Sequence, residues 1–388
     1  MIQKMWNKDF ILLILSNFFM YITYYAVISV LPIYLVSSLH STKSQVGIVV
    51  GIYTIAAVLI RPFTGFTLDR FNRHMIFVLA LGIYTFLFSG FLFAASILAL
   101  AFLRFSQGLT WGFTTVSGST IAVDIIPDEK RGEGIGYFAM STTLGMSVGP
   151  LIGIFICHQW NYTTMFASGF FISIVSLYCG YRVKLPKEIL AGKKIKFKWN
   201  TLFDKSSIRP SINLFVLMIP YGGLLSFIAI YGREIGVQNS SLFFLIFAIG
   251  IAISRFTAGK AFDKNGPRKI ITLCLILLMI GFPLLSSVKN EIGYYISALI
   301  IGFGNGVVFP IFQSMVNNLA DSEHRGAANS TLYTATDLGM GLGMILAGYI
   351  AQHISTSAIF LFSTFVIAAG LIIFRLYVLK YYESNVNS

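Results

Sequence analysis

RPFTGFTLDRFNRH occupies residues 61–74 of this chain, and RFTAGKAFDKNGPR occupies residues 255–268. In both stretches an arginine is followed by a glycine at the fifth position, an aspartate at the ninth and a basic residue at the tenth. The two stretches lie 194 residues apart in a chain of 388 residues, so the second half of the sequence repeats the first. A repeat of this length predicts two copies of one structural unit.

Further pairs of residues keep the same offset. Only 11% of the residues are charged, so matched charges at one register are hard to obtain by accident. The pairs include both charged residues and glycines: Glu129 with Glu323, Arg131 with Arg325, Gly108 with Gly302, Gly112 with Gly306, Gly132 with Gly326, Gly145 with Gly339, and Gly149 with Gly343. We therefore interpret the chain as a duplication.

The composition is that of an integral membrane protein. The mean hydropathy is +0.78 and 56% of the residues are hydrophobic, whereas soluble domains carry about 25% charged residues. A helix crosses a bilayer with roughly 20 apolar residues. Stretches of that kind begin near residues 9, 44, 75, 97, 134, 164, 210, 240, 270, 293, 329 and 358. The sequence thus predicts an all-α membrane protein with twelve spans, six in each half. The first span is too long for a signal peptide, so we expect no cleaved leader.

The distribution of Lys and Arg predicts the orientation, because short loops rich in these residues stay in the cytoplasm. With a cytoplasmic amino terminus, only Lys43, Arg233 and Lys289 fall outside. We expect a multi-pass protein of the plasma membrane with both termini in the cytoplasm. The formal charge of +13 then reflects topology and contact with anionic lipid, and it requires no nucleic-acid partner.

An even number of spans returns each half to the side where it began, so the halves should be parallel repeats. We expect an N-terminal six-helix bundle at residues 1–183 and a C-terminal six-helix bundle at residues 210–388. Residues 184–209 form a basic cytoplasmic linker between them. Its interleaved apolar residues favour a solvated or lipid-surface helix over a regulatory site.

The repeated loop after the second span is a candidate gate. A small residue there allows two helices to approach closely, and an Asp can face the positive end of a neighbouring helix or pair with Arg. The alternative is an ordinary basic loop, although two such loops need not share their spacing. The gating candidates are Gly65, Asp69, Arg70 and Arg73 in the first copy, and Gly259, Asp263 and Lys264 in the second.

The fourth span contains Arg104, about seven residues from its outer end, and Gln107 three residues further on. An arginine at the bilayer centre costs on the order of 2.5–3.5 kcal/mol, so such a residue usually faces a cavity or a partner. The alternative is an arginine that extends to the outer interface or only joins two helices. The fifth span combines glycines near one helix face with a proline, a pattern that permits close packing and bending: Gly136, Gly145, Gly149, Pro150 and Gly153.

These elements together resemble the major facilitator superfamily, in particular its twelve-span drug:proton antiporter branch. The resemblance covers the whole chain. Asn72 stands where the loop motif usually has Gly, and Ile154 replaces a frequent last glycine of the fifth-span motif. The resemblance implies two six-helix bundles around a central cavity that opens alternately to each side. The fifth-span motif is associated in that family with antiport and export.

Asp337 is a carboxylate well inside the eleventh span, and it is the candidate proton site. An ionised acid is costly in the membrane, so its protonation should respond to the opening of the cavity. The alternative is an Asp that hydrogen-bonds neighbouring helices. The matching position in the first half is Thr143, so the duplication lost its symmetry here.

Other polar and aromatic residues within spans are weaker candidates, because each also suits helix packing. Relatives that export cationic drugs place an acid inside the first span, whereas this span has none after Asp9, which disfavours a cationic drug. The candidates are Asn17, Tyr21, Tyr24 and Tyr25 in the first span, Tyr221 and Tyr231 in the seventh, and Asn305 and Gln313 in the tenth.

Several kinds of site are not indicated. The sequence has no phosphate-binding Gly-rich loop and hence no ATP site, and neither a metal-ligand spacing nor a Ser/His/Asp arrangement. We expect no cofactor, and we assign the three cysteines to packing. A membrane enzyme would need more reactive groups near the midplane, and a channel would not need the duplicated gate.

Our leading hypothesis is a monomeric, proton-coupled secondary transporter that exports a small amphipathic compound or metabolite. Its partners would be the substrate, protons and the lipid bilayer. The alternative is proton-coupled uptake of a nutrient such as a sugar, an amino acid or a carboxylate.

Overall fold

The computed structural model describes residues 6–94, 96–127, 130–185, 204–320 and 325–386. Within these ranges, the side chains of residues 62, 65, 66, 69, 131–133, 256–266, 325–327 and 386 are not described. The chain forms two compact units. The N-terminal unit contains residues 1–34 and 52–197, and the C-terminal unit contains residues 35–51 and 198–388. The short segment Leu35–Gly51 therefore groups with the C-terminal unit although it precedes most of the first repeat.

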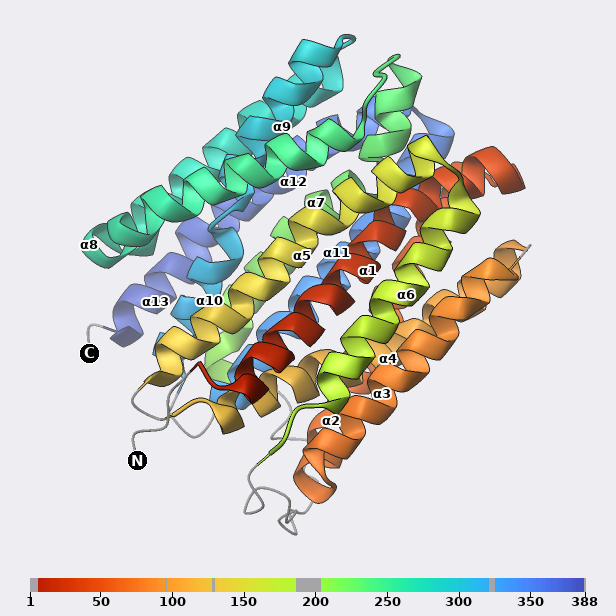
Figure 1. Cartoon of the computed structure of the whole chain (residues 1–388). Helices are drawn as coiled ribbons and strands as arrows, with labels where there is room; N and C mark the ends of the chain where they lie inside the picture. Colours follow the sequence, from red (N-terminus) through yellow and green to blue (C-terminus); the bar gives the residue numbers. More distant parts are fainter. Residues whose placement is uncertain (1–5, 95, 128–129, 186–203, 321–324, 387–388) are drawn as a thin grey trace. The chain divides into compact units, whose positions relative to one another are not determined.

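Every regular element in the described residues is helical (Figure 1). The first six spans are α1 (Lys8–Leu39), α2 (Lys43–Arg70), α3 (Arg73–Ser89), α4 (Ile97–Ile125), α5 (Arg131–Gln159) and α6 (Tyr162–Tyr181), with a 3-10 turn η1 (Gly90–Leu92) after α3. The remaining helices are α7 (Ile208–Glu234), α8 (Ser241–Ser287), α9 (Glu291–Asn305), α10 (Val308–Leu319), α11 (Arg325–His353), α12 (Thr356–Ile373) and α13 (Leu379–Val386). The 3-10 turn η5 (Lys205–Ser207) precedes α7, and the π-helical turn η6 (Phe374–Val378) joins α12 to α13.

Ten helical segments of the described chain are long and apolar enough to cross a membrane. One is the pair α9 and α10, which together cover Glu291–Leu319. The two remaining predicted spans correspond to α4, which is 29 residues long, and to the shorter apolar helix Ser241–Arg255. The helices thus occupy all twelve predicted positions.

Helix α8 contains two of these spans, although it is continuous over 47 residues. Gly250 and Gly281 are 31 residues apart, which is about 46 Å along a straight helix. Both nevertheless lie against the same stretch of α9: Gly250 against Leu299 and Phe303, and Gly281 against Ile300 and Ile301. The chain must therefore reverse direction within α8. The eighth and ninth spans run antiparallel to each other, and both pack against α9.

The two repeats use the same glycines for the same contacts. A side chain at any of these positions would overlap atoms of the facing helix, so glycine allows the close approach. The contacts recur at the offset of 194: Gly108 on Tyr53 and Gly302 on Phe247, Gly112 on Ala57 and Gly306 on Ile251, Gly145 on Tyr21 and Gly339 on Phe215. The duplication inferred from the sequence is therefore visible in the helix packing.

Helix N-caps recur at the same offset. The side chain of an N-cap residue accepts a hydrogen bond from a backbone N–H that the first helical turn leaves unpaired. Ser96 caps α4 and Asn290 caps α9, while Asn161 caps α6 and Ser355 caps α12. Each pair differs in residue type but keeps the capping oxygen.

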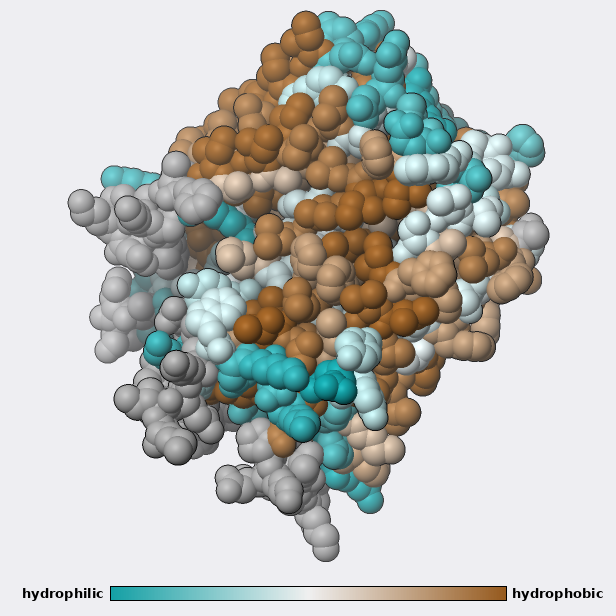
Figure 2. Space-filling model, in the orientation of Figure 1, coloured by the Kyte–Doolittle hydropathy of each residue, from teal (hydrophilic) through white to brown (hydrophobic). Residues whose placement is uncertain are grey.

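Large hydrophobic side chains cover much of the visible surface (Figure 2). Leu98 is 81% exposed, Phe86 is 74% exposed and Phe365 is 67% exposed. In water, apolar patches of this extent would drive association. In a bilayer they face lipid tails, which explains why the predicted spans show no polar outer face.

Candidate functional site

Arg104 is the largest side chain that is fully buried in the described chain, at 1% exposure. It lies in the second turn of α4, between the contact glycine Gly108 and the Ser96 cap. Its guanidinium carbon lies 4.1 Å from the ring centre of Tyr53 and 5.7 Å from that of Tyr24. Aromatic faces carry partial negative charge, so both rings stabilise the cation.

An aromatic cluster of the N-terminal unit adjoins this arginine. The ring of Tyr24 stacks on Trp111 at 4.5 Å and on Tyr53 at 4.8 Å. Tyr21, half-buried at the edge of the cluster, meets Trp111 edge to face at 4.8 Å. The side chains come from three helices, α1, α2 and α4, so the cluster forms only when these helices pack. It brings together the predicted residues Tyr21, Tyr24 and Arg104.

The two predicted amides of this unit, Gln107 and Asn17, differ in their partners. Gln107 is 1% exposed, and neither polar atom of its side chain has a hydrogen-bond partner among the described residues. Asn17 donates to the hydroxyls of Ser141 at 2.8 Å and Thr142 at 2.9 Å. Asn17 thus joins α1 to α5, as the packing alternative expects, while Gln107 retains donors and an acceptor for a ligand.

The glycines of α5 pack against α1. A Cβ atom at Gly149 would lie 2.7 Å from the carbonyl oxygen of Ile22, and one at Gly153 would lie 2.9 Å from the Cα atom of Ala26. Gly145 meets Tyr21 in the same way, and α5 continues through Pro150. Gly136 has no heavy atom within 4 Å of its Cβ position. Three of the four predicted glycines therefore serve close packing, and Gly136 does not.

Asp337 is half-buried in α11. It lies twelve residues after the start of the helix at Arg325, which is about 18 Å along the axis and deeper than the two turns expected. Gly339 and Gly343 pack against α7. Positions two residues apart lie about 200° apart around a helix, so Asp337 is on a different face from these glycines.

Polar residues also connect α10 and α11 within the C-terminal unit. The predicted Gln313 donates to Asn329 at 3.2 Å, and Asn329 donates to Asn317 at 2.6 Å. Asn305, at the end of α9, is half-buried. The predicted tyrosines of α7 are buried: Tyr221 stacks on Phe247 at 6.3 Å, and the Tyr231 hydroxyl lies 3.0 Å from the carbonyl oxygens of Leu285 and Val288. The bonds of Tyr231 fit helix packing.

The first copy of the repeated loop is held within its own unit. Arg73 pairs with Asp124 at the end of α4 through both carboxylate oxygens, each at 2.9 Å. Asn72, which departs from the usual glycine, is the N-cap of α3 and accepts from the backbone N–H of Met75 at 3.2 Å. Arg70 is exposed, with its guanidinium 5.8 Å from the ring of Phe71. The side chains of Asp69, Asp263 and Lys264 lie outside the described residues, and at Gly65 and Gly259 only the helical backbone is described.

A second charged contact lies in the C-terminal unit. The Lys43 Nζ atom is 2.6 Å from Glu234 and 2.8 Å from the Thr356 hydroxyl, and the Lys43 backbone N–H donates to Gln352. This contact was not predicted from the sequence, since the partners come from α2, α7, α11 and α12. It ties the start of α2 to three helices of the second repeat.

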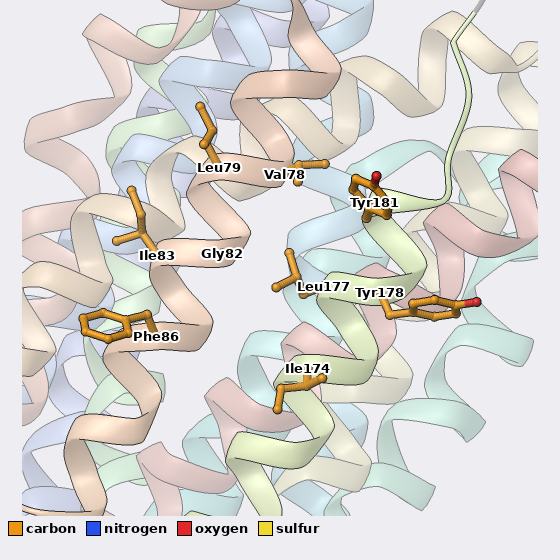
Figure 3. Close-up of a pocket in the computed structure, with 9 residues that line it drawn as sticks. All are labelled: Val78, Leu79, Gly82, Ile83, Phe86, Ile174, Leu177, Tyr178 and Tyr181. Atoms are coloured by element: carbon orange, nitrogen blue, oxygen red, sulfur yellow. The ribbon is translucent and has the colours of Figure 1, made fainter.

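A groove opens between α3 and α6 on the hydrophobic surface (Figure 3). Its walls are almost wholly apolar, with Leu79, Phe86 and Tyr181 all more than half exposed, and Gly82 gives it depth. A groove of this kind suits lipid tails. It contains none of the candidate site residues.

Trp111 and Tyr53 belong to the aromatic cluster beside Arg104, and the sequence analysis did not predict them. Trp111 had a detectable signal, because Arg104, Gln107 and Trp111 recur at helical spacing on one face of α4. Tyr53 had none, because it comes from another helix and its position depends on the contact of Gly108 with α2.

The duplicated six-helix arrangement and a buried, charged cluster within its spans define a membrane transporter built from two repeats. The profile of the Major Facilitator Superfamily matches residues 13–243 and 211–388, and the chain belongs to this family. The predicted fold class, a twelve-helix major facilitator fold, and the predicted resemblance to the drug-export branch are confirmed.

Relatives and solved structures agree with this assignment. The chain is 25% identical to the staphylopine export protein of Staphylococcus aureus, over 81% of this chain and 82% of that protein. It is 24% identical to the multidrug resistance protein MdtG of Klebsiella pneumoniae, over 95% and 92% of the two chains. The crystal structure of the nucleoside transporter NupG superposes with a TM-score of 0.73 at 14% identity, covering 94% of this chain and 99% of that one. This last similarity shows the fold alone.

Proposed function

We propose that the protein is a proton-coupled exporter of a small amphipathic compound, and that it works by alternating access in the plasma membrane. What supports export is the packing of Gly145, Gly149 and Gly153 of α5 against α1, the spacing associated with antiport in this family. The names of the staphylopine and multidrug relatives point in the same direction. The proposal includes a monomer with both termini in the cytoplasm.

The charged residues have separate roles in this proposal. Arg104 and its aromatic neighbours contact the substrate, because a buried cation next to aromatic rings can hold an amphipathic molecule. Asp337 carries the proton, since an acid inside a span is costly when ionised and is usually functional. The two repeated loops, with Asp69 and Asp263, close the cytoplasmic side, and Gly149 and Pro150 let α5 move.

The contact of Lys43 with Glu234 fits a gate on the outer side of the membrane, opposite the two repeated loops. Lys43 and Glu234 fall on the outer side in the orientation that the positive charges predict. Both side chains are partly exposed, so the pair contributes little to stability and can be broken at low cost. We assign it to an outer gate that opens when substrate is released.

Proton movement in energised inside-out vesicles tests the proposal. Vesicles that contain the protein are challenged with cationic, neutral and anionic compounds, and vesicles without it serve as the control. Export predicts that at least one compound releases protons from the vesicles only when the protein is present. If a compound instead accumulates in right-side-out vesicles with inward proton movement, the protein is an uptake system, which is the second candidate.

A further inference from the structure

The charge of Arg104 has no hydrogen-bond compensation in the described residues of its unit. Its Nε and Nη2 atoms have no hydrogen-bond partner there, and the adjacent amide of Gln107 has none either. Contact with aromatic rings stabilises a cation but leaves N–H groups without acceptors. Buried polar groups in proteins are nearly always paired, so unpaired donors on two successive turns of one helix indicate a missing acceptor.

The acidic side chains described in the N-terminal unit are both engaged elsewhere. Asp9, at the start of α1, accepts from the backbone N–H of Lys184 at 2.9 Å. Asp124 pairs with Arg73 and lies twenty residues beyond Arg104 on α4, about 30 Å away along the axis. Neither carboxylate reaches the guanidinium.

Helix packing does not require this arginine. In the second repeat, Gly302 and Gly306 make the same contacts with α8 that Gly108 and Gly112 make with α2. The positions that match Arg104 and Gln107 are Ala298 and Ile301. One copy of the arrangement therefore packs without the charge, and the arginine in the other copy needs a reason other than packing.

The neighbouring rings define what else a ligand must carry. Tyr24 lies against both Trp111 and Tyr53, with interplanar angles of 29° and 28°, while Trp111 and Tyr53 are tilted by 56° with their ring centres 5.9 Å apart, so the three rings form an aromatic cluster beside the guanidinium. Flat apolar groups bind well against such surfaces. A guanidinium presents a planar fork of donors that matches the two oxygens of a carboxylate.

We propose that Arg104 and Gln107, together with Tyr24, Tyr53 and Trp111, form a binding subsite for a substrate that carries both a carboxylate and a flat apolar group. The carboxylate accepts from Arg104 and Gln107, and the apolar group lies against the aromatic rings. This inference rests on the proposed function, because it names the substrate class of that transporter. It also agrees with the absence of an acid from the interior of α1.

Three compounds of one shape and different charge test the subsite: phenylacetate, phenylacetamide and phenethylamine. Trp111 provides the signal once Trp6, Trp160 and Trp199 are replaced by Phe. Trp6 is 51% exposed and Trp160 is 63% exposed, so those two changes should be tolerated. Binding to the purified full chain is followed by Trp111 fluorescence, and by the shift of the thermal unfolding midpoint in the chain with its native tryptophans.

We expect phenylacetate to give a saturable change, with binding at least about tenfold tighter than that of the amide or the amine. Arg104→Gln should remove this preference, and Arg104→Lys should weaken phenylacetate binding because it keeps the charge but loses the fork. Arg375→Gln, a change at an exposed arginine, should have no effect. If Arg104→Gln fails to fold, the comparison of the three compounds in protein that keeps Arg104 still tests the subsite.

The subsite is wrong if the amide or the amine binds as well as phenylacetate, if phenylacetate gives no saturable change up to its solubility limit, or if folded Arg104→Gln binds it normally. These measurements do not involve transport. If phenylacetate binds as expected while no compound releases protons in the vesicle experiment, the subsite stands and proton-coupled export fails.

Discussion

At the scale of single residues, the two repeats differ at two charged positions inside the predicted spans. Asp337 replaces a counterpart threonine, Thr143, and Arg104 replaces a counterpart alanine, Ala298. Each repeat thus contributes one charged position that the other lacks. By contrast, the contacts of Gly108, Gly112 and Gly145 recur at Gly302, Gly306 and Gly339. The two repeats therefore share these helix contacts and differ in their charged side chains.

Asp337→Asn should abolish transport driven by a proton gradient, because the amide cannot exchange a proton. Exchange of labelled for unlabelled substrate across vesicles should continue, since that process needs no net proton movement. The measurement is uptake of labelled substrate with and without an imposed pH gradient. Glu383→Gln, at an exposed position in α13, is the matched control and should behave as the wild type. Gradient-driven transport at the wild-type rate by folded Asp337→Asn would remove the coupling role.

Part of the candidate site could be predicted from single residues. Arg104 and Gln107 stand out because polar groups are costly inside a span. Asn17 stands out for the same reason, yet its bonds to Ser141 and Thr142 fit packing. The sequence could not separate these cases, because the partners come from other helices whose rotation it does not specify. Tyr53 was missed for the same reason.

At the scale of elements, the spans were predictable and their details were less so. Apolar length alone gives the starts of the helices, because the bilayer sets that length. The caps at Ser96, Asn161, Asn290 and Ser355 were also within reach, since they combine a capping residue with the repeat offset. The split of the tenth span into α9 and α10 was not predicted.

Glycine contacts give the element-scale prediction. Gly149→Ala places a Cβ atom 2.7 Å from the backbone of Ile22, so it should destabilise the protein by about 1–3 kcal/mol. Gly136→Ala lies on the same helix with open space at its Cβ position, and alanine favours a helix over glycine by roughly 1 kcal/mol. Thermal unfolding midpoints of the two variants in detergent provide the comparison. Equal midpoints would show that α5 does not pack tightly on α1.

At the scale of the whole molecule, the segment Leu35–Gly51 belongs to the first repeat by sequence and to the C-terminal unit by contact. Gly47 and Gly348 meet at their backbones, with the Cβ position of Gly47 3.0 Å from the Cα atom of Gly348. Lys43 adds its ion pair with Glu234. Under the proposed alternating access, opening of the outer side would require this segment to separate from α7 and α11.

Joining residues 43 and 234 covalently should stop transport under alternating access. We expect the double variant Lys43→Cys with Glu234→Cys to lose turnover when treated with a short bifunctional thiol reagent, and to regain it when a reducible reagent is cleaved. The measurement is substrate transport before and after reduction. Each single variant is a control, and so is the wild type with its native Cys157, Cys179 and Cys274. Full turnover by the joined protein would exclude an opening at this contact.

The shared glycine contacts also have a consequence for how the chain tolerates change. A scan of all substitutions, scored by the amount of folded protein, should show intolerant glycines in pairs separated by 194 positions, as at Gly108 and Gly302. A scan scored by transport should add sensitive positions that occur only once, at Arg104 and Asp337. Subtracting one half of such a map from the other would cancel the paired glycine contacts and leave the positions at which the two repeats differ, among them the residues proposed to bind substrate and protons.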